Sequence, residues 1–391
     1  MLSYYDLLKL RKKGFSSDYY TSLAALNMGG GRNRKISGIP PLTIKSNGAP
    51  VSEWQLWGNT SQNTVPFADE PVEVLGVGNK TINRYNWKDT SNRRNLWHNN
   101  GRYSYDETRL LVFIPCVGDE MYTLYRFDNV STPWYTSQCT ERPENNVSYL
   151  RNGQTTFVNI GNEKNYTFRT YPEMNYISIS FTGLSNEQII EQILPKLMVC
   201  RSSSTTLPYE PYGYKVPITV NQSEDAVIYL DEPLYKGDYL KLGSDGNGIL
   251  HRENGIKIFD GSENWSAVNI SGNGAGLQIT EMKNGEYQAG FCSHAVHAED
   301  TAAGRMAFGM NDNSLYWFGI LDLLELDSIS EFKSFLSEQK ASDTPLTVCF
   351  PLASPSDTPV VLPQINTVSG INTINVNTEI TPEKMYVKYK G

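Results

Sequence analysis

Apolar and polar residues alternate over short stretches along most of this chain, which is the pattern of half-buried β-strands. The alternation is clear at residues 120–127 and 176–181, whereas residues 109–116 form a continuous apolar run that is typical of a buried strand. Glycine, asparagine and proline separate the runs and give turn signals between them. The pattern predicts a mainly β fold. Further candidate strands lie at residues 154–160, 197–200, 227–230, 239–242, 255–261, 346–349 and 370–380.

Two stretches depart from this pattern and have a helical period. Residues 185–194 carry three isoleucines on one side, and residues 328–339 begin with a capping box formed by Ser328 and Glu331. Each predicted helix is followed by the same strand sequence, Leu-x-Val-Cys, and then by a proline-rich segment. Because this plan occurs twice, we expect two jelly-roll or β-sandwich domains in tandem.

A chain of 391 residues is too long for one ordinary core, and its composition changes at several points. We expect, in order, a helical docking arm, a small β linker domain, a first sandwich, a second sandwich and a β tail. The tail has little core of its own, so it should pair with the edge of a sandwich in the same chain or of a neighbouring subunit. The five expected segments are residues 1–35, 36–84, 85–219, 220–361 and 362–391.

The charge of the chain is unevenly distributed. The whole chain carries −8, but residues 1–35 contain seven Lys and Arg against Asp6 and Asp18, which gives 7 − 2 = +5. Such a segment fits an arm that docks on an acidic partner, and equally the solvated face of short helices. The residues expected to carry assembly through this arm are Tyr4, Tyr5, Leu7, Leu8, Arg11, Lys12 and Lys13.

Composition argues against several classes of protein. The net negative charge is unlike that of a general nucleic-acid binder. No apolar run reaches the roughly 20 residues of a membrane span, and the first residues lack a signal-peptide layout, so we expect a protein made in a cytoplasm. Five widely spaced cysteines without a Cys-x-x-Cys pair do not form a disulfide framework, and we expect buried thiols in strands.

Catalytic and metal-binding patterns are weak. Cys292, His294 and His297, followed by Glu299 and Asp300, resemble a partial zinc ligand set. Residues on one extended segment need not face the same way, so we expect a loop with a buried thiol and no bound metal.

The chain has no nucleophile elbow, zincin helix or phosphate-binding loop. The neighbouring carboxylates Asp119 and Glu120, or Glu141 and Glu144, could be posed as the acid and base of a glycosidase. Their separation in space decides that question, and we expect neither an enzyme nor a cofactor.

Aromatic residues with polar neighbours give a stronger indication of binding. Trp97 and Tyr103 lie in one loop-rich stretch and Trp134 and Tyr135 in another, with Asn and Arg nearby. Sugar rings stack on Trp and Tyr, while amides and guanidinium groups bind their hydroxyls, so these four residues form a candidate glycan site. The alternative is that they fill a core or an interface.

Several short motifs together resemble tail and minor structural proteins, including distal tail proteins, of tailed bacteriophages and prophages of Firmicutes and related gut bacteria. In those proteins the segment like residues 207–213 closes a carbohydrate-binding-like jelly roll. The motifs are Ser3-Tyr-Tyr-Asp-Leu-Leu8, Leu207-Pro-Tyr-Glu-Pro-Tyr-Gly213, Tyr229-Leu-Asp-Glu-Pro-Leu234, Asp260-Gly-Ser-Glu-Asn-Trp265, Cys292-Ser-His294 and Asn377-Thr-Glu-Ile-Thr-Pro382.

The resemblance implies a structural component of a phage tail tip, baseplate or fibre, located in the virion. Its implied partners are other tail proteins, copies of itself in a trimer or another cyclic assembly, and a glycan of the host surface. A dedicated receptor-binding protein for such a glycan and a glycan depolymerase are the alternatives.

Overall fold

The chain is mainly β in the computed structural model, with 45% strand and 10% helix, and its strands form several antiparallel sheets. This confirms the predicted mainly β class. By contact the chain divides into two compact units, which are described separately. Unit 1 takes in residues 1–79, 215–333 and 346–391, and unit 2 takes in residues 80–214 and 334–345, so most of unit 2 is an insertion in the chain of unit 1. The structure describes residues 42–46, 51–220, 223–243, 246–270, 274–279, 290–297, 306–311, 315–319, 328–342, 344–361, 370–383 and 385–389.

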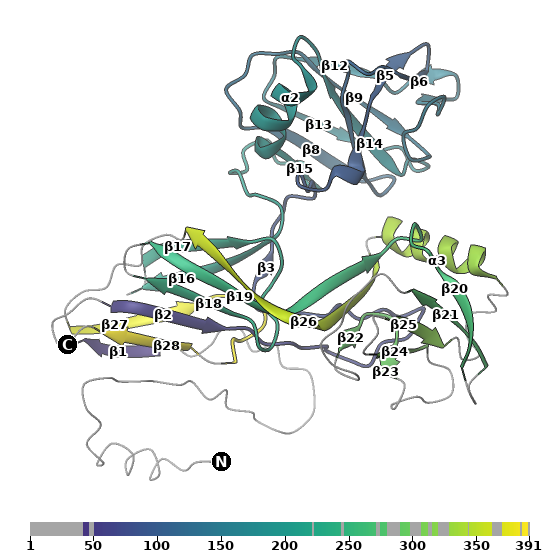
Figure 1. Cartoon of the computed structure of the whole chain (residues 1–391). Helices are drawn as coiled ribbons and strands as arrows, with labels where there is room; N and C mark the ends of the chain where they lie inside the picture. The colour runs from purple at the N-terminus through teal and green to yellow at the C-terminus, as the bar shows by residue number, and fades with distance from the viewer. Residues whose placement is uncertain are drawn as a thin grey trace, which may run out of the picture. The chain divides into compact units, whose positions relative to one another are not determined.

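Unit 2 contains a five-stranded and a three-stranded antiparallel sheet (Figure 1). Strand β14 alternates and β7 is buried, as the sequence predicts, and Ile177 and Ile179 of β14 face a core that also holds Val112 and Ile114 of β7. The five-stranded order is β12 (Val158–Gly161), β9 (Trp134–Cys139), β14 (Tyr176–Phe181), β7 (Leu111–Pro115) and β4 (Arg93–Arg94). The three-stranded order is β13 (Asn165–Arg169), β8 (Met121–Arg126) and β15 (Leu197–Cys200).

Two hairpins belong to unit 2 in addition to these sheets. Strands β5 (Leu96–Asn99) and β6 (Arg102–Tyr105) pair with each other, as do β10 (Leu150–Arg151) and β11 (Gln154–Thr155). Both turn on an Asn-Gly pair in which each residue has positive φ, 48° and 81° at Asn100 and Gly101 and 48° and 78° at Asn152 and Gly153. These angles define the two-residue turns that match the twist of a hairpin.

The helix predicted at residues 185–194 is present, with Ser185 as its cap in a capping box with Gln188. It begins as α2 (Asn186–Gln188), widens into a π-helical turn η2 (Ile189–Ile193) and closes as a 3₁₀ turn η3 (Leu194–Lys196) that leads into β15. A second 3₁₀ turn, η1 (Thr90–Asn92), precedes β4. Ile189 and Ile193 are buried in the core, as their spacing predicts.

Unit 1 combines strands that lie far apart in the sequence. One sheet has the order β1 (Leu42–Ser46), β27 (Gly370–Val376), β16 (Tyr214–Val220) and β17 (Ser223–Leu230), with β3 (Asn79–Lys80) on β16. The other has the order β22 (Phe291–Cys292), β26 (Leu346–Val361), β19 (Asn247–Phe259), β18 (Tyr239–Gly243), β2 (Val51–Trp57) and β28 (Met385–Tyr389).

This topology corrects the expected linker domain at residues 36–84. Strand β2 pairs with β18 on one side and with β28 on the other, and β1 pairs with β27. Alternation along a segment predicts a strand but does not predict which other strand it pairs with. The sequence pattern therefore cannot show that residues 36–84 join the sheets of unit 1. The tail strands β27 and β28 pair within their own chain.

The two longest strands, β19 and β26, form a ribbon along most of their length (Figure 1). Their pairing is interrupted between Arg252 and Asn254, where residues 352–355 of β26 have no opposite residue. The buried carboxylate of Asp238 stabilises this irregularity, because it accepts hydrogen bonds from the backbone N–H groups of Glu253 (2.8 Å) and Asn254 (3.0 Å). Proline occurs at every fourth position of β26, at residues 351, 355 and 359.

A further five-stranded sheet of unit 1 has the order β20 (Ser266–Ile270), β21 (Gly274–Ile279), β25 (Leu315–Gly319), β24 (Ala307–Asn311) and β23 (Val296–His297). Helix α3 (Ile329–Ala341) follows, capped by Ser328, whose hydroxyl accepts from the backbone N–H of Glu331. Phe332 and Leu336 of α3 are buried, and the ring of Phe332 meets that of Trp265 edge-on at 4.9 Å. The helix predicted at residues 328–339 is therefore confirmed.

Candidate functional site

The four aromatic residues predicted to bind a glycan do not share one surface. Strand β9 places Trp134 and Tyr135 on opposite faces of its sheet, because side chains alternate along a strand. Trp134 is fully buried in the core, with its indole stacked on Phe181 at 6.3 Å, and Tyr103 is fully buried against the other face of the sheet. Neither ring can be reached by a ligand in this conformation, so their assignment to the site is corrected.

Trp97 and Tyr135 do come together, and both are partly exposed. Their ring centroids lie 5.7 Å apart and the rings are nearly perpendicular, at 85°. The ring of Phe157 stacks on Tyr135 at 5.3 Å, and the guanidinium group of Arg109 lies 4.8 Å from the centroid of Trp97. These four residues, called here the Trp97 cluster, combine apolar ring surface with a hydrogen-bond donor, which is the chemistry that binds sugars.

The sequence pattern alone does not assign Phe157 and Arg109 to the site. Strand β12 begins just after Phe157 and pairs with β9 so that Asn159 lies opposite Tyr135. Arg109 directly precedes the buried run that forms β7. Both residues lie within predicted strands, at residues 154–160 and 109–116, but only the pairing of strands brings them to Trp97 and Tyr135.

A chain of buried polar groups lies close to the cluster. The Nε2 atom of His98 is 2.9 Å from the hydroxyl of Ser137, which is 2.6 Å from that of Ser178, and the hydroxyl of Tyr103 contacts both serines. Burial lowers the pKa of His98 to about 3, so its imidazole is neutral at ordinary pH. Such an imidazole is a poor general base, and the contact between His98 and Ser137 does not have the chemistry of a nucleophile pair.

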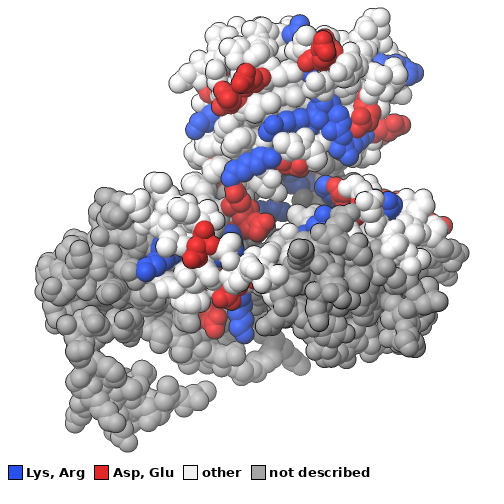
Figure 2. All heavy atoms as spheres, viewed as in Figure 1, with Lys and Arg blue, Asp and Glu red and all other residues white. Residues whose placement is uncertain are grey.

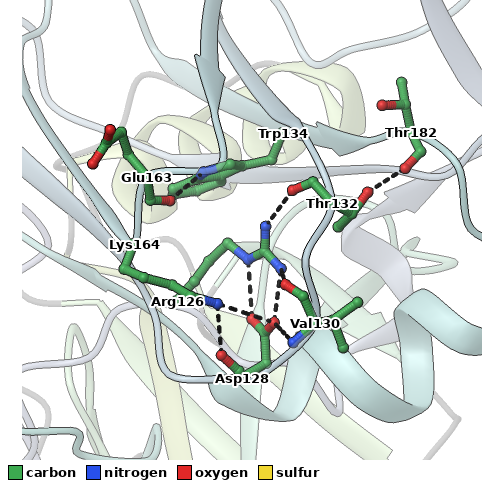
Figure 3. A network of polar contacts seen from close by, with 8 residues as sticks. All are labelled: Arg126, Asp128, Val130, Thr132, Trp134, Glu163, Lys164 and Thr182. Carbon is green, nitrogen blue, oxygen red and sulfur yellow. Dashed lines mark hydrogen bonds and ion pairs between the residues drawn. The ribbon is translucent and has the colours of Figure 1, made fainter.

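On the opposite face of the sheet, an ion pair is buried in the core (Figure 3). The guanidinium group of Arg126 donates to both carboxylate oxygens of Asp128, at 2.7 and 3.0 Å, and to the carbonyls of Val130 and Thr132. Its carbon lies 5.7 Å from the ring centroid of Trp134. The partners of Arg126 are all groups of the protein itself. They hold the loop between β8 and β9 in place.

The four carboxylates considered as glycosidase pairs are at the surface, and among the described residues all but Glu141 form ion pairs with arginines. Asp119 contacts Arg169 at 2.9 Å, Glu120 contacts Arg201, and Glu144 contacts Arg94 at 2.9 Å. The hydrogen bond from Arg201 lowers the pKa of Glu120, the opposite of what a general acid requires. On the face shown in Figure 2, basic and acidic side chains of the described residues are interspersed.

The segment considered for zinc is a buried turn. Cys292 and His294 are 1% and 0% exposed, burial raises the pKa of the Cys292 thiol to about 12, and the side chain of His297 lies outside the described residues. No group of three His, Cys, Asp or Glu side chains in the described part of the chain is placed to hold a metal ion. All five cysteines are free and buried.

The assembly residues predicted in the arm, from Tyr4 to Lys13, lie outside the described residues. None of the helices that the structure describes combines the length and the apolar character required to cross a membrane. No protein-family model, no curated protein and no solved structure matches the chain.

Proposed function

We propose that this chain is a non-enzymatic structural component of a phage tail tip, baseplate or fibre. It assembles in the virion with other tail proteins and with copies of itself, using the basic N-terminal arm for docking. The observation that carries the proposal is the place of the resemblance motifs in the fold. All five motifs after residue 200 contribute side chains or backbone to contacts between segments or to a buried turn, as shared structural motifs should.

The motif at residues 207–213 lies against the outer face of the three-stranded sheet of unit 2. The hydroxyl of Tyr209 donates to the carbonyl of Pro195 at 2.6 Å, and the carboxylate of Glu210 accepts from the backbone N–H of Ile82 at 3.1 Å. Tyr209 and Leu207 pack on a cluster that contains Tyr125 and Met198. This motif therefore closes the sheet, as its counterpart does in the resembling proteins.

The later motifs have comparable positions. In the motif at residues 260–265, the buried carboxylate of Glu263 accepts from the backbone N–H of Gly261 at 3.0 Å. In the motif at residues 292–294, the carbonyl of Ser293 accepts from the backbone N–H of Val72 at 2.8 Å. In the last motif the backbone N–H of Asn377 donates to the carbonyl of Pro217 at 3.0 Å.

The proposal includes two sandwich domains whose strands and helices follow the same order. Strand β14 lies between β7 and β9, and β25 lies between β21 and β24. Each central strand leads through a helix to a Leu-x-Val-Cys strand, β15 or the start of β26, which pairs with β8 or β22.

The test is to purify the particles of the virus or prophage that encodes the chain. Mass spectrometry should detect its peptides at a fixed ratio to other tail proteins, and antibody labelling should place it at the tip, baseplate or fibre. As a control, cell proteins of similar abundance should fall to background on purification. Particles that lack the chain and infect normally would contradict the proposal.

The Trp97 cluster favours a second role, contact with a glycan of the host surface. The partly exposed rings of Trp97 and Tyr135 supply stacking surface, and Arg109 supplies N–H donors beside them. This role is compatible with the first, because tail proteins that assemble can also reach the host.

Binding to purified wall polysaccharides tests the second role. Trp97→Ala and Tyr135→Ala should each weaken binding tenfold or more, which corresponds to about 1.4 kcal/mol or more of lost contact. Tyr171→Ala is the matched control, because Tyr171 also carries an arginine over its ring, Arg151 at 4.2 Å. Equal losses in all three variants, or no binding by the unmodified chain, would count against this role.

A further inference from the structure

One face of the five-stranded sheet of unit 2 is covered, and it combines serine residues with the apolar side chains of Leu111, Phe113 and Cys139. Along β14, Ile177 and Ile179 face the core between the sheets, while Ser178 and Ser180 face the other way. On β9, Ser137 lies directly opposite Ser178, and Tyr135 lies opposite Ser180. All three serines are fully buried, at 0% exposed.

The hairpin formed by β5 and β6 covers this face. Its strands pair with each other, and Arg102 of β6 also forms an isolated bridge with Ser148. Its contacts with the sheet are made by side chains, since His98 reaches Ser137 and Tyr103 reaches Ser137 and Ser178. Backbone bonds join it to a neighbouring loop, from Tyr103 N–H to the Val147 carbonyl and from Tyr149 N–H to the Gly101 carbonyl. A two-stranded hairpin held in this way is only marginally stable by itself.

Two polar atoms beneath the hairpin are buried without a hydrogen-bond partner, the Nδ1 atom of His98 and the hydroxyl of Ser180. Each would gain a partner from water if the hairpin lifted, so the closed state carries a penalty that the open state lacks.

The surroundings of His98 cannot accommodate a charge. Its ring is 4.5 to 5.5 Å from the rings of Trp97, Tyr103, Tyr149 and Phe157. Burial raises the pKa of Tyr103 and Tyr149, and that of the Cys139 thiol to about 12, so these titratable neighbours are also neutral. No carboxylate of the described residues is among these neighbours to stabilise an imidazolium ion.

We propose that the hairpin at residues 96–105 is a cover that acid releases, exposing the face of the sheet that carries Tyr135, Ser137, Ser178 and Ser180. In the open state His98 is hydrated and binds a proton at an ordinary histidine pH, about 6.5, whereas the closed state excludes the proton. The ratio of open to closed protein therefore rises as the pH falls below about 6.5, up to about tenfold for each pH unit, until the closed state can also be protonated.

Hydrogen exchange of the full-length chain at pH 7.5 and 5.0 tests the proposal, after correction for the intrinsic pH dependence of exchange. The amides of Tyr103 and Tyr149 should open about 30-fold more often at pH 5.0, given 1.5 pH units below about 6.5. The amides of β7 and β14 serve as an internal control and should keep their protection. Equal opening of the hairpin at both pH values would overturn the proposal.

Two variants separate the role of His98 from general acid sensitivity. His98→Gln cannot become charged and should abolish the pH dependence, whereas His251→Gln, at a partly exposed histidine of unit 1, should leave it intact. If His98→Gln fails to fold, Tyr103→Phe offers an independent check. It removes two hydroxyl contacts, so the hairpin should open more at pH 7.5 and still respond to acid. A pH response that persists in His98→Gln, or that is lost in Tyr103→Phe, would contradict the proposal.

Discussion

Arg126 shows how a single residue can depart from its sequence pattern. It ends an alternating strand, where a charged residue would ordinarily face solvent, yet it is 3% exposed. Burial of a charge is tolerated only when its donors are satisfied, and Asp128 together with two carbonyls accepts them here. Lys164 also donates to the carbonyl of Asp128, at 2.7 Å. The sequence contains these residues, but nothing in their spacing shows that they converge.

Removing one partner of this pair should be more harmful than removing both. Asp128→Ala leaves a buried guanidinium group without its carboxylate and should lower the free energy of unfolding by about 3–5 kcal/mol. The double variant Arg126→Met with Asp128→Ala replaces the charge by an apolar chain beside Trp134 and should lose less. Urea unfolding of unit 2 measures both.

Glu173→Ala is the control for this prediction, because it breaks an exposed ion pair with Arg151 and should have a much smaller effect. If the double variant were less stable than Asp128→Ala, the buried pair would contribute more than its desolvation penalty. That result would contradict the prediction that removing one partner is more harmful than removing both.

At the scale of elements, the sequence predicts where single strands and helices begin and end, but it does not predict which strands pair. The bounds of β14 and β15 match the predicted stretches, and helix α3 begins at its predicted serine cap. These features depend on side chains within a few residues of one another. The pairing of β2 with β18 spans nearly 200 residues and leaves no trace in either strand alone.

For the candidate site, too, the sequence predicts local features but not contacts between distant segments. Trp97 and Tyr135 were predicted together only as aromatic residues near polar ones, and the contact between them depends on how the β5–β6 hairpin lies against β9. The alternation of β9 does separate Trp134 from Tyr135, so one of the two corrected assignments could have been avoided. The burial of Tyr103 required knowledge of the hairpin.

At the scale of the whole molecule, the insertion of unit 2 is the main departure from the expected tandem order. Every strand of its two sheets lies between Arg93 and Cys200, so the sheets need no strand from the rest of the chain. The expected second sandwich, residues 220–361, differs in this respect, because β18 pairs with β2 and β16 pairs with β27, outside that range.

These topologies predict different behaviour of two fragments. Residues 80–214 expressed alone should fold cooperatively, because their sheets are complete. Residues 220–361 should aggregate or remain unfolded, because they lack β2 and β27. Circular dichroism and thermal melting distinguish the outcomes, and a folded second fragment beside an unfolded first would show that the division into units is wrong.

The prolines of β26 have a consequence for solubility. A strand accommodates proline only where the missing N–H faces away from its neighbour, and Pro351 and Pro359 lie opposite Asn254 and Ile249 of β19. The outer edge of the ribbon therefore lacks donors at these positions. A β-rich chain risks fusing one sheet edge to another, which leads to insoluble fibrils. A foreign strand laid along this edge would find carbonyls without matching N–H groups, so the longest strand of the protein is a poor template for aggregation.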